Sequence, residues 1–558
     1  MNRRGFWITL LATSAASVGL LWLPCGHAAS SWCVPLGVPG EWVWNRIPVG
    51  EGGAATLLLG WSLAAVALLV YGGVVWIGAT RVSNCSRAET AFWLAALAMA
   101  GFCWLSLLQE SPPDGYRTSK AVQVLYYPSS SGYFFEARYE IDDVPSFLAN
   151  YEERMAEGDV LHVGTHPPGL FLFHHSLIQL CNRFPSLTNF VLTTQPESAD
   201  AAGALIADQT RGTTTPLLAT GRAALWLAAL ITQAVGVLAV VPLYLLIRRT
   251  HQSQASFLAV ALWPLVPALA IFLPKSDALY PFIGLMFLYC WLEGCRHRSL
   301  LRCAMAGLLF WLGMLLSLAI LPVGLLALLL SVWETRAADD TTSEIGIGEG
   351  GWGRLKGAPR FTHTGGSLRS TPATPIWLKL CISAAIGAVA FLAATFALWA
   401  AYDVNLFNVW RWNVVNHSAF YDQFDRSYWK WVLVNPLELS LAVGLPVILL
   451  AIAGCRRAMQ QSGNWRASRL GPCVCCMTTI GLLWLSGKNS GEAARLWLFL
   501  MPWLIWLAAD MFARPVKAGA GKQIAPVSVV PMGALAVIAL QAIVCIATVT
   551  RVTGFGGM

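Results

Sequence analysis

Residues 223–247, AALWLAALITQAVGVLAVVPLYLLI, contain no charged side chain and are followed at once by Arg248 and Arg249. A helix needs about 20 mostly apolar residues to cross the hydrocarbon core of a bilayer. This stretch therefore predicts a membrane-spanning helix that ends at a basic loop.

The rest of the chain has the same character. Its 558 residues are 56% hydrophobic and only 12% charged, whereas soluble domains carry roughly 25% charged residues. This composition excludes a soluble enzyme and predicts an all-α integral membrane protein, a polytopic helix bundle of about 13 spans. The candidate spans lie near residues 6–23, 53–78, 89–109, 223–247, 254–273, 278–294, 302–317, 319–333, 378–401, 435–454, 470–486, 495–513 and 526–549.

The basic residues set the predicted orientation, because Lys and Arg are retained in cytoplasmic loops. Arg3 and Arg4 place the N-terminus in the cytoplasm. The other basic loops fall on the same side if residues 302–333 form a helical hairpin, which Pro322 favours by breaking the helix. The net charge of +8 then reflects topology, and no nucleic-acid partner is expected. The loops predicted to face outward are 110–222, 273–277, 402–434 and 487–494.

Three segments are predicted. Residues 1–85 form a two-span extension whose start also resembles a secretory signal, although its apolar run is long for a signal core. Residues 86–513 form the membrane core, with short amphipathic helices in outer loop 110–222 and a flexible cytoplasmic insert at 334–377. Residues 514–558 add a C-terminal span.

The cysteines are scattered along the chain, and most lie inside apolar runs of the sequence. Cys25 and Cys33 lie in an outer stretch where a disulfide is chemically allowed. Cys473, Cys475 and Cys476 lack the ligand spacing of a zinc site and are expected to be small core side chains.

The first outer cluster runs from Tyr133 to Asp143. A carboxylate such as Glu136 held against aromatic rings can serve as a general base. Together with Asp142 and Asp143 it could instead hold Mg²⁺ or Mn²⁺ through oxygen. The third reading, an amphipathic helix whose acids face water, stays open beside these two. Arg138 belongs to the same stretch.

The second outer cluster contains His162 and His166, followed by Pro167 and Pro168. Consecutive prolines cannot lie inside a helix but can begin one. Either histidine could ligate a metal or contact a substrate hydroxyl. For the adjacent pair at 174–175, structural hydrogen bonds are expected.

Three further outer sites carry charged or aromatic residues. Arg binds phosphate through paired hydrogen bonds, and a lysine facing inward would meet an anionic headgroup. The alternatives are snorkelling, an interfacial aromatic belt and a surface ion pair. The candidate substrate-binding residues at these sites are Lys275, Asp277, His417, Tyr421, Glu492 and Arg495.

Taken together, these motifs resemble the polytopic glycosyltransferases of the GT-C superfamily that use polyprenyl-phosphate-linked sugars. These include protein O-mannosyltransferases and bacterial transferases that add aminoarabinose to lipid A. The resemblance covers residues 89–513 and rests on the acidic stretch 136–143, His166-Pro167-Pro168, Lys275-Ser276-Asp277 and residues 491–497.

There are two departures from this family. Relatives usually place the acidic loop after the first span and open it with Asp-Glu, whereas here two spans precede it and no such pair is present. The catalytic carboxylate therefore stays open between Glu136, Asp142, Asp143 and Asp114.

The resemblance implies transfer of a sugar from a polyprenyl-phosphate donor to a hydroxyl of a glycan, lipid or protein acceptor. The reaction would occur at the outer face of a bacterial inner membrane, with an outer-loop carboxylate as base and Tyr133, Arg138, His162 and His166 among the substrate-binding residues. A divalent cation, Mg²⁺ or Mn²⁺, is left open. The alternatives are a secondary transporter or lipid flippase, and a non-catalytic assembly or sensor protein.

Overall fold

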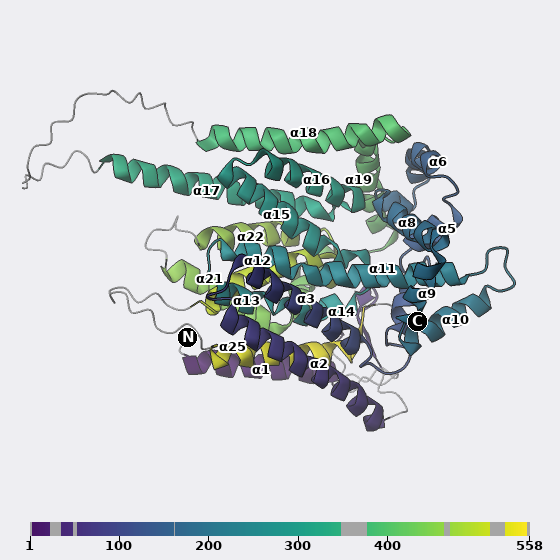
Figure 1. Ribbon diagram of the computed structural model, residues 1–558, viewed down its shortest axis with the longest axis horizontal. Coiled ribbons are helices and arrows are strands. Elements are labelled where there is room, and N and C mark those ends of the chain that lie inside the picture. The colour runs from purple at the N-terminus through teal and green to yellow at the C-terminus, as the bar shows by residue number, and fades with distance from the viewer. Residues whose placement is uncertain are drawn as a thin grey trace, which may run out of the picture.

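The computed structural model describes residues 3–22, 35–47, 53–160, 162–347, 376–461, 469–513 and 530–554. Long helices run side by side in one bundle, and the short helices of residues 110–218 gather at one end, called here the loop end (Figure 1). Cys25, Cys33, the signal-like site at 26–28 and most of the insert 334–377 lie outside the described residues.

The described chain is an all-α membrane protein, as predicted. Nine of its helices are long and apolar enough to cross a bilayer; α20 and α21 form a pair bent by 106°, and three shorter apolar segments span Leu300–Leu316, Leu470–Leu485 and Leu498–Met511. The count of about 13 spans stays a prediction. The helices of the bundle are α1 Arg3–Trp22, α2 Gly53–Arg81, α3 Arg87–Gln109, α11 Ala219–Leu238, α12 Val240–Arg248, α13 Ser253–Val260, α14 Pro267–Ile271, α15 Tyr280–His297, α16 Leu300–Leu316, α17 Leu321–Ile347, α18 Ile376–Tyr402, α20 Tyr428–Val443, α21 Leu445–Gln461, α22 Leu470–Leu485, α24 Met501–Ala508 and α25 Met532–Val549.

The ambiguous stretch 302–333 contains the predicted break. Helix α16 ends at Leu316, a short 3-10 turn covers Leu318–Ile320, and α17 begins at Leu321. Pro322 is the second residue of α17, where a missing N–H breaks no helical hydrogen bond.

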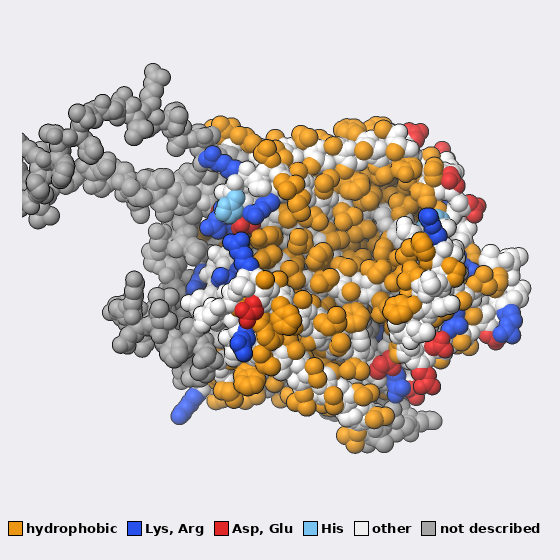
Figure 2. Space-filling view, in the orientation of Figure 1, with side chains coloured by type: hydrophobic (Ala, Val, Ile, Leu, Met, Phe, Trp, Pro, Cys, Tyr) orange, Lys and Arg blue, Asp and Glu red, His pale blue; other side chains and the backbone are white. Residues whose placement is uncertain are grey.

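Basic residues mark the end of the bundle opposite the loop end, called here the basic end. Helix α2 ends at Arg81, α12 at Arg248, and the last turn of α15 holds Arg296 and His297. Figure 2 shows Lys and Arg gathered along one edge and a broad hydrophobic band between that edge and the loop end. A band of this kind is the surface that faces lipid in a spanning bundle.

Short helices build the loop end. They cannot cross a bilayer, so they must lie at its surface or against the bundle. They are α4 Ser119–Tyr126, α5 Tyr133–Tyr139, α6 Val144–Ala149, α7 Tyr151–Ala156, α8 Gly169–Arg183, α9 Pro185–Thr193, α10 Glu197–Gln209, α19 Leu406–Gln423 and α23 Ala493–Leu496.

Four two-residue strands form two antiparallel pairs, one of which joins residues 45–46 to residues 552–553. Strands β1 (Gly37–Val38) and β2 (Trp42–Val43) form an antiparallel hairpin. Strand β3 (Asn45–Arg46) pairs with β4 (Val552–Thr553), with Asn45 opposite Thr553. Helix α1 packs on α21 and α25, and α2 packs on α3, α13 and α25. The predicted extension 1–85 is thus packed into the bundle.

Candidate functional site

Arg495 is the centre of a charged group at the loop end, called here the Arg495 cluster. Its Nη2 donates to Glu492 Oε2 at 2.7 Å, and its Nε lies 3.8 Å from Asp277 Oδ2. The side chain is only 17% exposed, and Nε has no hydrogen-bond partner among the described residues. Two carboxylates therefore hold the guanidinium while one buried donor is left to receive an acceptor atom.

Lys275 adds a second cation from the turn before α15. Burial and, to a smaller extent, the positive charge of Arg495 lower the pKa of Lys275 to about 7, against the opposing charges of Glu492 and Asp277. These mutual effects place residues 275–277 and 492–495 in one electrostatic group. The predicted convergence of these two distant motifs is therefore present in the fold.

Tyr133, the first residue of α5, lies among the rings of three histidines near this cluster. Its ring lies 5.3 Å from the His166 ring, 6.0 Å from the His162 ring and 6.4 Å from a parallel His174 ring. Burial raises the pKa of Tyr133; Asp277 adds to this shift, and Arg495 opposes it. Tyr133 is thus uncharged at neutral pH and within electrostatic reach of the guanidinium.

The turn before Tyr133 depends on a glycine. Gly132 has a φ of +71°, and a Cβ there would overlap the His162 ring. Any other residue would meet both the left-handed backbone and the imidazole. The glycine therefore lets α5 begin directly beside this histidine.

Both histidines of the second motif face this group in their neutral form. Burial, together with the charges of His162 and Arg495, lowers the pKa of His166 to about 3. Burial also lowers the pKa of His162, and Lys275 and Arg495 act in the same direction. A neutral imidazole can donate at one nitrogen and accept at the other, which suits recognition of hydroxyl groups.

The His-Pro-Pro element enters helix α8 as predicted. Pro168 is the residue before Gly169, the first residue of α8. The prolines thus precede the helix, where their missing N–H groups break no helical bond. The Tyr151 hydroxyl donates to the His166 carbonyl at 2.6 Å and fixes the turn from the other side.

Helix α19 holds the same element through two amide side chains. Asn416 Nδ2 donates to the carbonyls of Met155 and Gly164 at 2.8 and 2.9 Å, and Asn413 donates to the Thr165 carbonyl. His417 follows on the same helix and is close enough to influence His166 electrostatically.

Tyr421, one turn further along α19, contacts the loop that carries Arg495. Its hydroxyl accepts the Asn489 N–H at 2.8 Å. Its ring stands 5.6 Å from the His417 ring. Tyr421 therefore connects α19 to the segment that leads to Glu492.

Glu136 lies on α5, three residues after Tyr133, and residues spaced in this way are neighbours on a helix surface. Its Oε2 pairs with Arg154 at 3.3 Å, and Arg154 is also 3.3 Å from Glu140. Burial raises the pKa of Glu136, and Arg154 opposes the rise. Glu136 is thus half-buried on the helix that carries Tyr133, and it shares one arginine with an exposed acid.

Three predicted residues have other contacts. Arg138 donates to the Pro216 carbonyl at 2.6 Å, which ties α5 to the segment before α11. Asp142 and Asp143 are exposed. Asp143 Oδ2 accepts the Ser146 N–H and caps α6. A helix cap explains this acid without a ligand.

Structural hydrogen bonds were predicted for both residues 174 and 175, and the structure shows one for residue 175 only. His175 Nδ1 bonds the Ala137 carbonyl at 3.2 Å, as expected. For His174 the prediction is wrong: its buried Nδ1 has no hydrogen-bond partner among the described residues, and its ring stacks on Tyr133 instead.

Within the described residues, no three His, Cys, Asp or Glu side chains are arranged to hold a metal ion. The expectation of Mg²⁺ or Mn²⁺ bound by the 136–143 acids therefore has no preformed site there. A cation that arrives with a phosphate substrate stays open.

Several residues of the cluster were not singled out from the sequence. Tyr280, Tyr151 and Arg154 interact with Tyr133 or Glu136 across the loop end. Acids one helical turn apart at 136 and 140 were the available signal for Arg154, because like charges at this spacing are unfavourable without a cation between them. The two tyrosines are ordinary aromatic residues in the sequence and gave no such signal.

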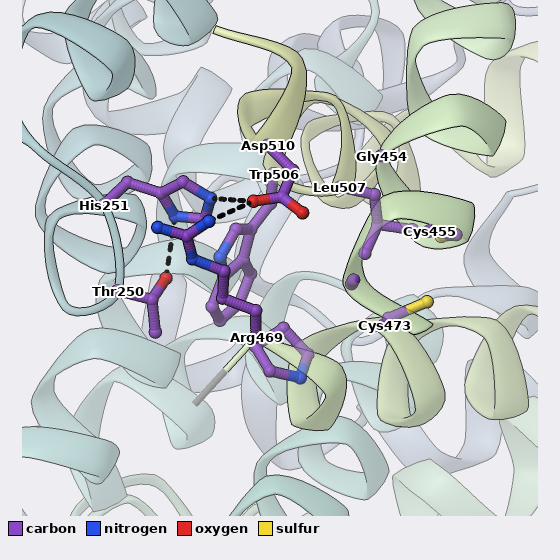
Figure 3. Close-up of a pocket in the computed structure, with 11 residues that line it drawn as sticks. Thr250, His251, Gly454, Cys455, Arg469, Cys473, Trp506, Leu507 and Asp510 are labelled. Atoms are coloured by element: carbon purple, nitrogen blue, oxygen red, sulfur yellow. Dashed lines mark hydrogen bonds and ion pairs between the residues drawn. The ribbon is translucent and has the colours of Figure 1, made fainter. Parts of the chain in front are cut away.

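A second polar group lies at the basic end and lines a pocket (Figure 3). Asp510 is its centre: Oδ1 lies 3.2 Å from His251 Nε2 and 3.0 Å from Arg469 Nη1, and Arg457 donates to the Asp510 carbonyl at 2.8 Å. Cys455 and Cys473 line the same pocket. We call this group the Asp510 cluster.

Comparison of the chain with models of protein families, with curated proteins and with solved structures finds no match.

Proposed function

We propose that this protein is a membrane glycosyltransferase that moves a sugar from a polyprenyl-phosphate donor to an acceptor hydroxyl. The observation that carries the proposal is the Arg495 cluster. It unites two buried cations, neutral histidines and aromatic rings from segments near residues 133, 166, 275, 417 and 495. Such a group fits a ligand that combines a negative charge with a hydroxyl-rich ring.

The cations suit the phosphate end of that ligand. Arg495 has a buried Nε without a hydrogen-bond partner among the described residues, and a guanidinium binds phosphate oxygens with matching geometry. Lys275 lies beside it as a point charge. Charge that builds on the leaving phosphate would be stabilised most where little water competes.

The rings suit the sugar end. His162 Nε2 bonds the Pro128 carbonyl, and His166 Nδ1 lies 3.1 Å from Thr165 Oγ1. Each neutral imidazole therefore has one ring nitrogen left for a sugar hydroxyl. Tyr133 and His417 add flat apolar faces beside them. Together they would hold the ring with its anomeric carbon between the phosphate and the acceptor.

Glu136 is the proposed general base. It would take the proton of the acceptor hydroxyl, whose oxygen then bonds to the anomeric carbon. The bond from that carbon to the phosphate oxygen breaks, and the electron pair leaves with the lipid phosphate. The raised pKa of this carboxyl supports the assignment, because a base works best when its pKa approaches the working pH.

The proposed orientation places the loop end outside the membrane and the basic end in the cytoplasm of a bacterial cell. Arg81, Arg248 and Arg296 support it, since Lys and Arg are retained on the cytoplasmic side. A donor carried in the outer leaflet would then reach the cluster from the side.

The test compares Glu136→Gln with Glu140→Gln in membranes supplied with a labelled polyprenyl-phosphate sugar. Both acids contact Arg154, but Glu140 is about half exposed, so it is a matched control. We expect Glu136→Gln to lower transfer by 10²–10⁴-fold, the usual contribution of a positioned base, and Glu140→Gln to lower it less than threefold.

Undiminished transfer by Glu136→Gln would reject this residue as the base. Passage of the labelled lipid across the bilayer without any sugar transfer would instead support the flippase alternative.

A further inference from the structure

The hairpin formed by residues 35–47 packs against helix α20. It precedes the first segment of the family resemblance, and nothing in the proposed chemistry uses it. Its turn residue Glu41 and its buried Trp44 nevertheless make long-range contacts to Trp431 and Glu438 of α20, and Glu438 in turn bonds the segment that carries Arg495. The question is what these contacts do.

Glu41 fastens the hairpin to the start of α20. Its Oε2 accepts the Ser427 N–H at 2.8 Å and the Trp431 indole N–H at 2.7 Å; its Oε1 accepts the Ser427 hydroxyl at 2.7 Å and Lys430 Nζ at 3.1 Å. Burial alone would raise the pKa of Glu41, but these bonds lower it to about 2. The acid is therefore charged at neutral pH and caps a helix N-terminus, which favours negative charge.

Trp44 reaches the segment of Arg495 through a shared carboxylate. Its indole Nε1 donates to Glu438 Oε1 at 2.9 Å, and the same oxygen accepts the Ala494 N–H at 3.3 Å. Ala494 is the residue before Arg495, in the short helix α23. The indole is only 4% exposed and Glu438 only 5% exposed, so water does not compete for this link.

Trp44 also reaches the segment of Lys275. Its ring stands edge-on to the Phe272 ring, with centroids 6.1 Å apart. The Phe272 carbonyl accepts the Lys275 N–H at 2.8 Å. One side chain therefore contacts the Lys275 segment directly and is linked to the Arg495 segment through Glu438.

Two more contacts leave this arrangement little freedom. Gly491 has a φ of +83°, and a Cβ there would lie 3.3 Å from Arg426 Nε and 3.6 Å from Trp42 Cβ. Beside the β3–β4 pair, the Ile47 N–H donates to the Arg551 carbonyl at 2.9 Å, and Arg551 Nη1 donates to the Ile47 carbonyl at 2.6 Å. The hairpin is thus held at both sides, and Trp44 contacts Phe272 on one side and Glu438 on the other.

We propose that the hairpin 35–47 sets the distance between Arg495 and Lys275, with Trp44 and Glu438 as positioning residues for binding of the anionic group of the donor. The proposal rests on the proposed transferase function for its anion. A positioning role needs no contact between Trp44 and the substrate. It requires that loss of the indole N–H weakens donor binding without unfolding the bundle.

The main variant is Trp44→Phe, which removes the donor to Glu438 and keeps a ring against Phe272. Trp506→Phe is its matched control: Trp506 is 2% exposed, its indole nitrogen has no hydrogen-bond partner among the described residues, and it lines the Asp510 pocket (Figure 3). Glu438→Leu removes the shared acceptor, whereas Glu438→Gln retains an oxygen that both donors can use.

The first measurement is steady-state transfer from a polyprenyl-phosphate sugar by the full-length protein. We expect Trp44→Phe and Glu438→Leu to raise the KM for the donor about tenfold, the effect of losing one hydrogen bond to a charged group, with kcat within twofold of wild type. Glu438→Gln and Trp506→Phe should change this KM less than threefold. A merely structural role would lower the amount of folded protein and leave KM unchanged.

The second measurement does not depend on activity. Amide hydrogen exchange of residues 491–497 in detergent should become about tenfold faster in Trp44→Phe, because the Ala494 N–H loses a fixed acceptor, and should be unchanged in Trp506→Phe. Exchange that stays as slow as in wild type would overturn the proposal, and so would faster exchange with an unchanged KM in an active wild-type background. If wild type transfers no sugar from any lipid phosphate, the transferase function fails, and the exchange measurement alone still decides whether the hairpin holds the Arg495 segment.

Discussion

The two ends of the bundle each bury a polar group that combines an arginine, a histidine and an acid, but the groups are built in opposite ways. At the loop end, cationic Arg495 is the centre, and Glu492 and Asp277 surround it. At the basic end, the anionic Asp510 is the centre, and His251 and Arg469 surround it (Figure 3).

This difference separates the two groups by the charge of the ligand each could take. Asp510 is surrounded by protein cations and gains nothing from an added anion, although its buried Oδ2 has no hydrogen-bond partner among the described residues. A cation with a spare buried donor gains from one, because an unmade buried hydrogen bond costs about 1–3 kcal/mol. The loop end is thus poised for an anion, whereas the basic end ties together the start of α13, α21 and the residues before α22.

The largest expected effect comes from removing the cation at the centre of the Arg495 cluster. Arg495→Gln should lower kcat/KM for the lipid-phosphate sugar by 10²–10³-fold, the usual cost of removing one charge-stabilising group. Arg469→Gln is the control from the Asp510 cluster and should change kcat/KM less than threefold. Both are read in the same transfer assay, normalised to folded protein. Equal losses in the two variants would contradict the assignment of only one end to chemistry.

The next effect is on stability at the basic end. Asp510→Asn leaves the cations Arg469 and Arg457 facing a neutral amide and should destabilise the protein by about 2 kcal/mol, below the range for fully buried pairs because Arg469 is partly exposed. We expect an apparent Tm a few degrees lower in detergent, with kcat per folded molecule unchanged. A large loss of kcat at an unchanged Tm would give this cluster a catalytic role.

Sequence reasoning predicted the fold where the signal is local. An apolar run such as 223–247 must be covered by lipid or protein, and Pro322 limits where a helix can begin. The β3–β4 pair was not predicted, because Asn45 and Thr553 meet only after the whole bundle has folded. Two-residue strands carry no periodic pattern that could reveal such a pairing.

The candidate site was predictable in its charged members and not in its supports. Arg495 and Lys275 stood out because charges near apolar spans are costly and need a reason. Trp44 was not singled out from the sequence, because its partner Glu438 lies 394 positions away. Asp143 misled because a helix cap and a metal ligand use the same carboxylate oxygens, and only the Ser146 N–H distinguishes them.

The smallest effect tests whether Lys275 shares the anion with Arg495. Burial lowers the pKa of Lys275 from its usual value to about 7, so the ammonium is present below pH 7 and is lost as the pH rises through 7. A phosphodiester donor keeps its charge throughout this range, and His166, with its pKa of about 3, is already neutral. We therefore expect kcat/KM for the donor, which reports the free enzyme, to fall about tenfold from pH 6 to pH 9.

In Lys275→Arg the guanidinium stays charged in this range, so the fall should disappear if the longer side chain reaches the same anion. The same pH profile in both proteins would remove Lys275 from the site and leave Arg495 as the cation that a donor phosphate must find. In that case the comparison between the two ends would depend on a single buried guanidinium. The two ends would then differ in the kind of buried atom left without a partner among the described residues: the donor Nε of Arg495 at the loop end and the acceptor Oδ2 of Asp510 at the basic end.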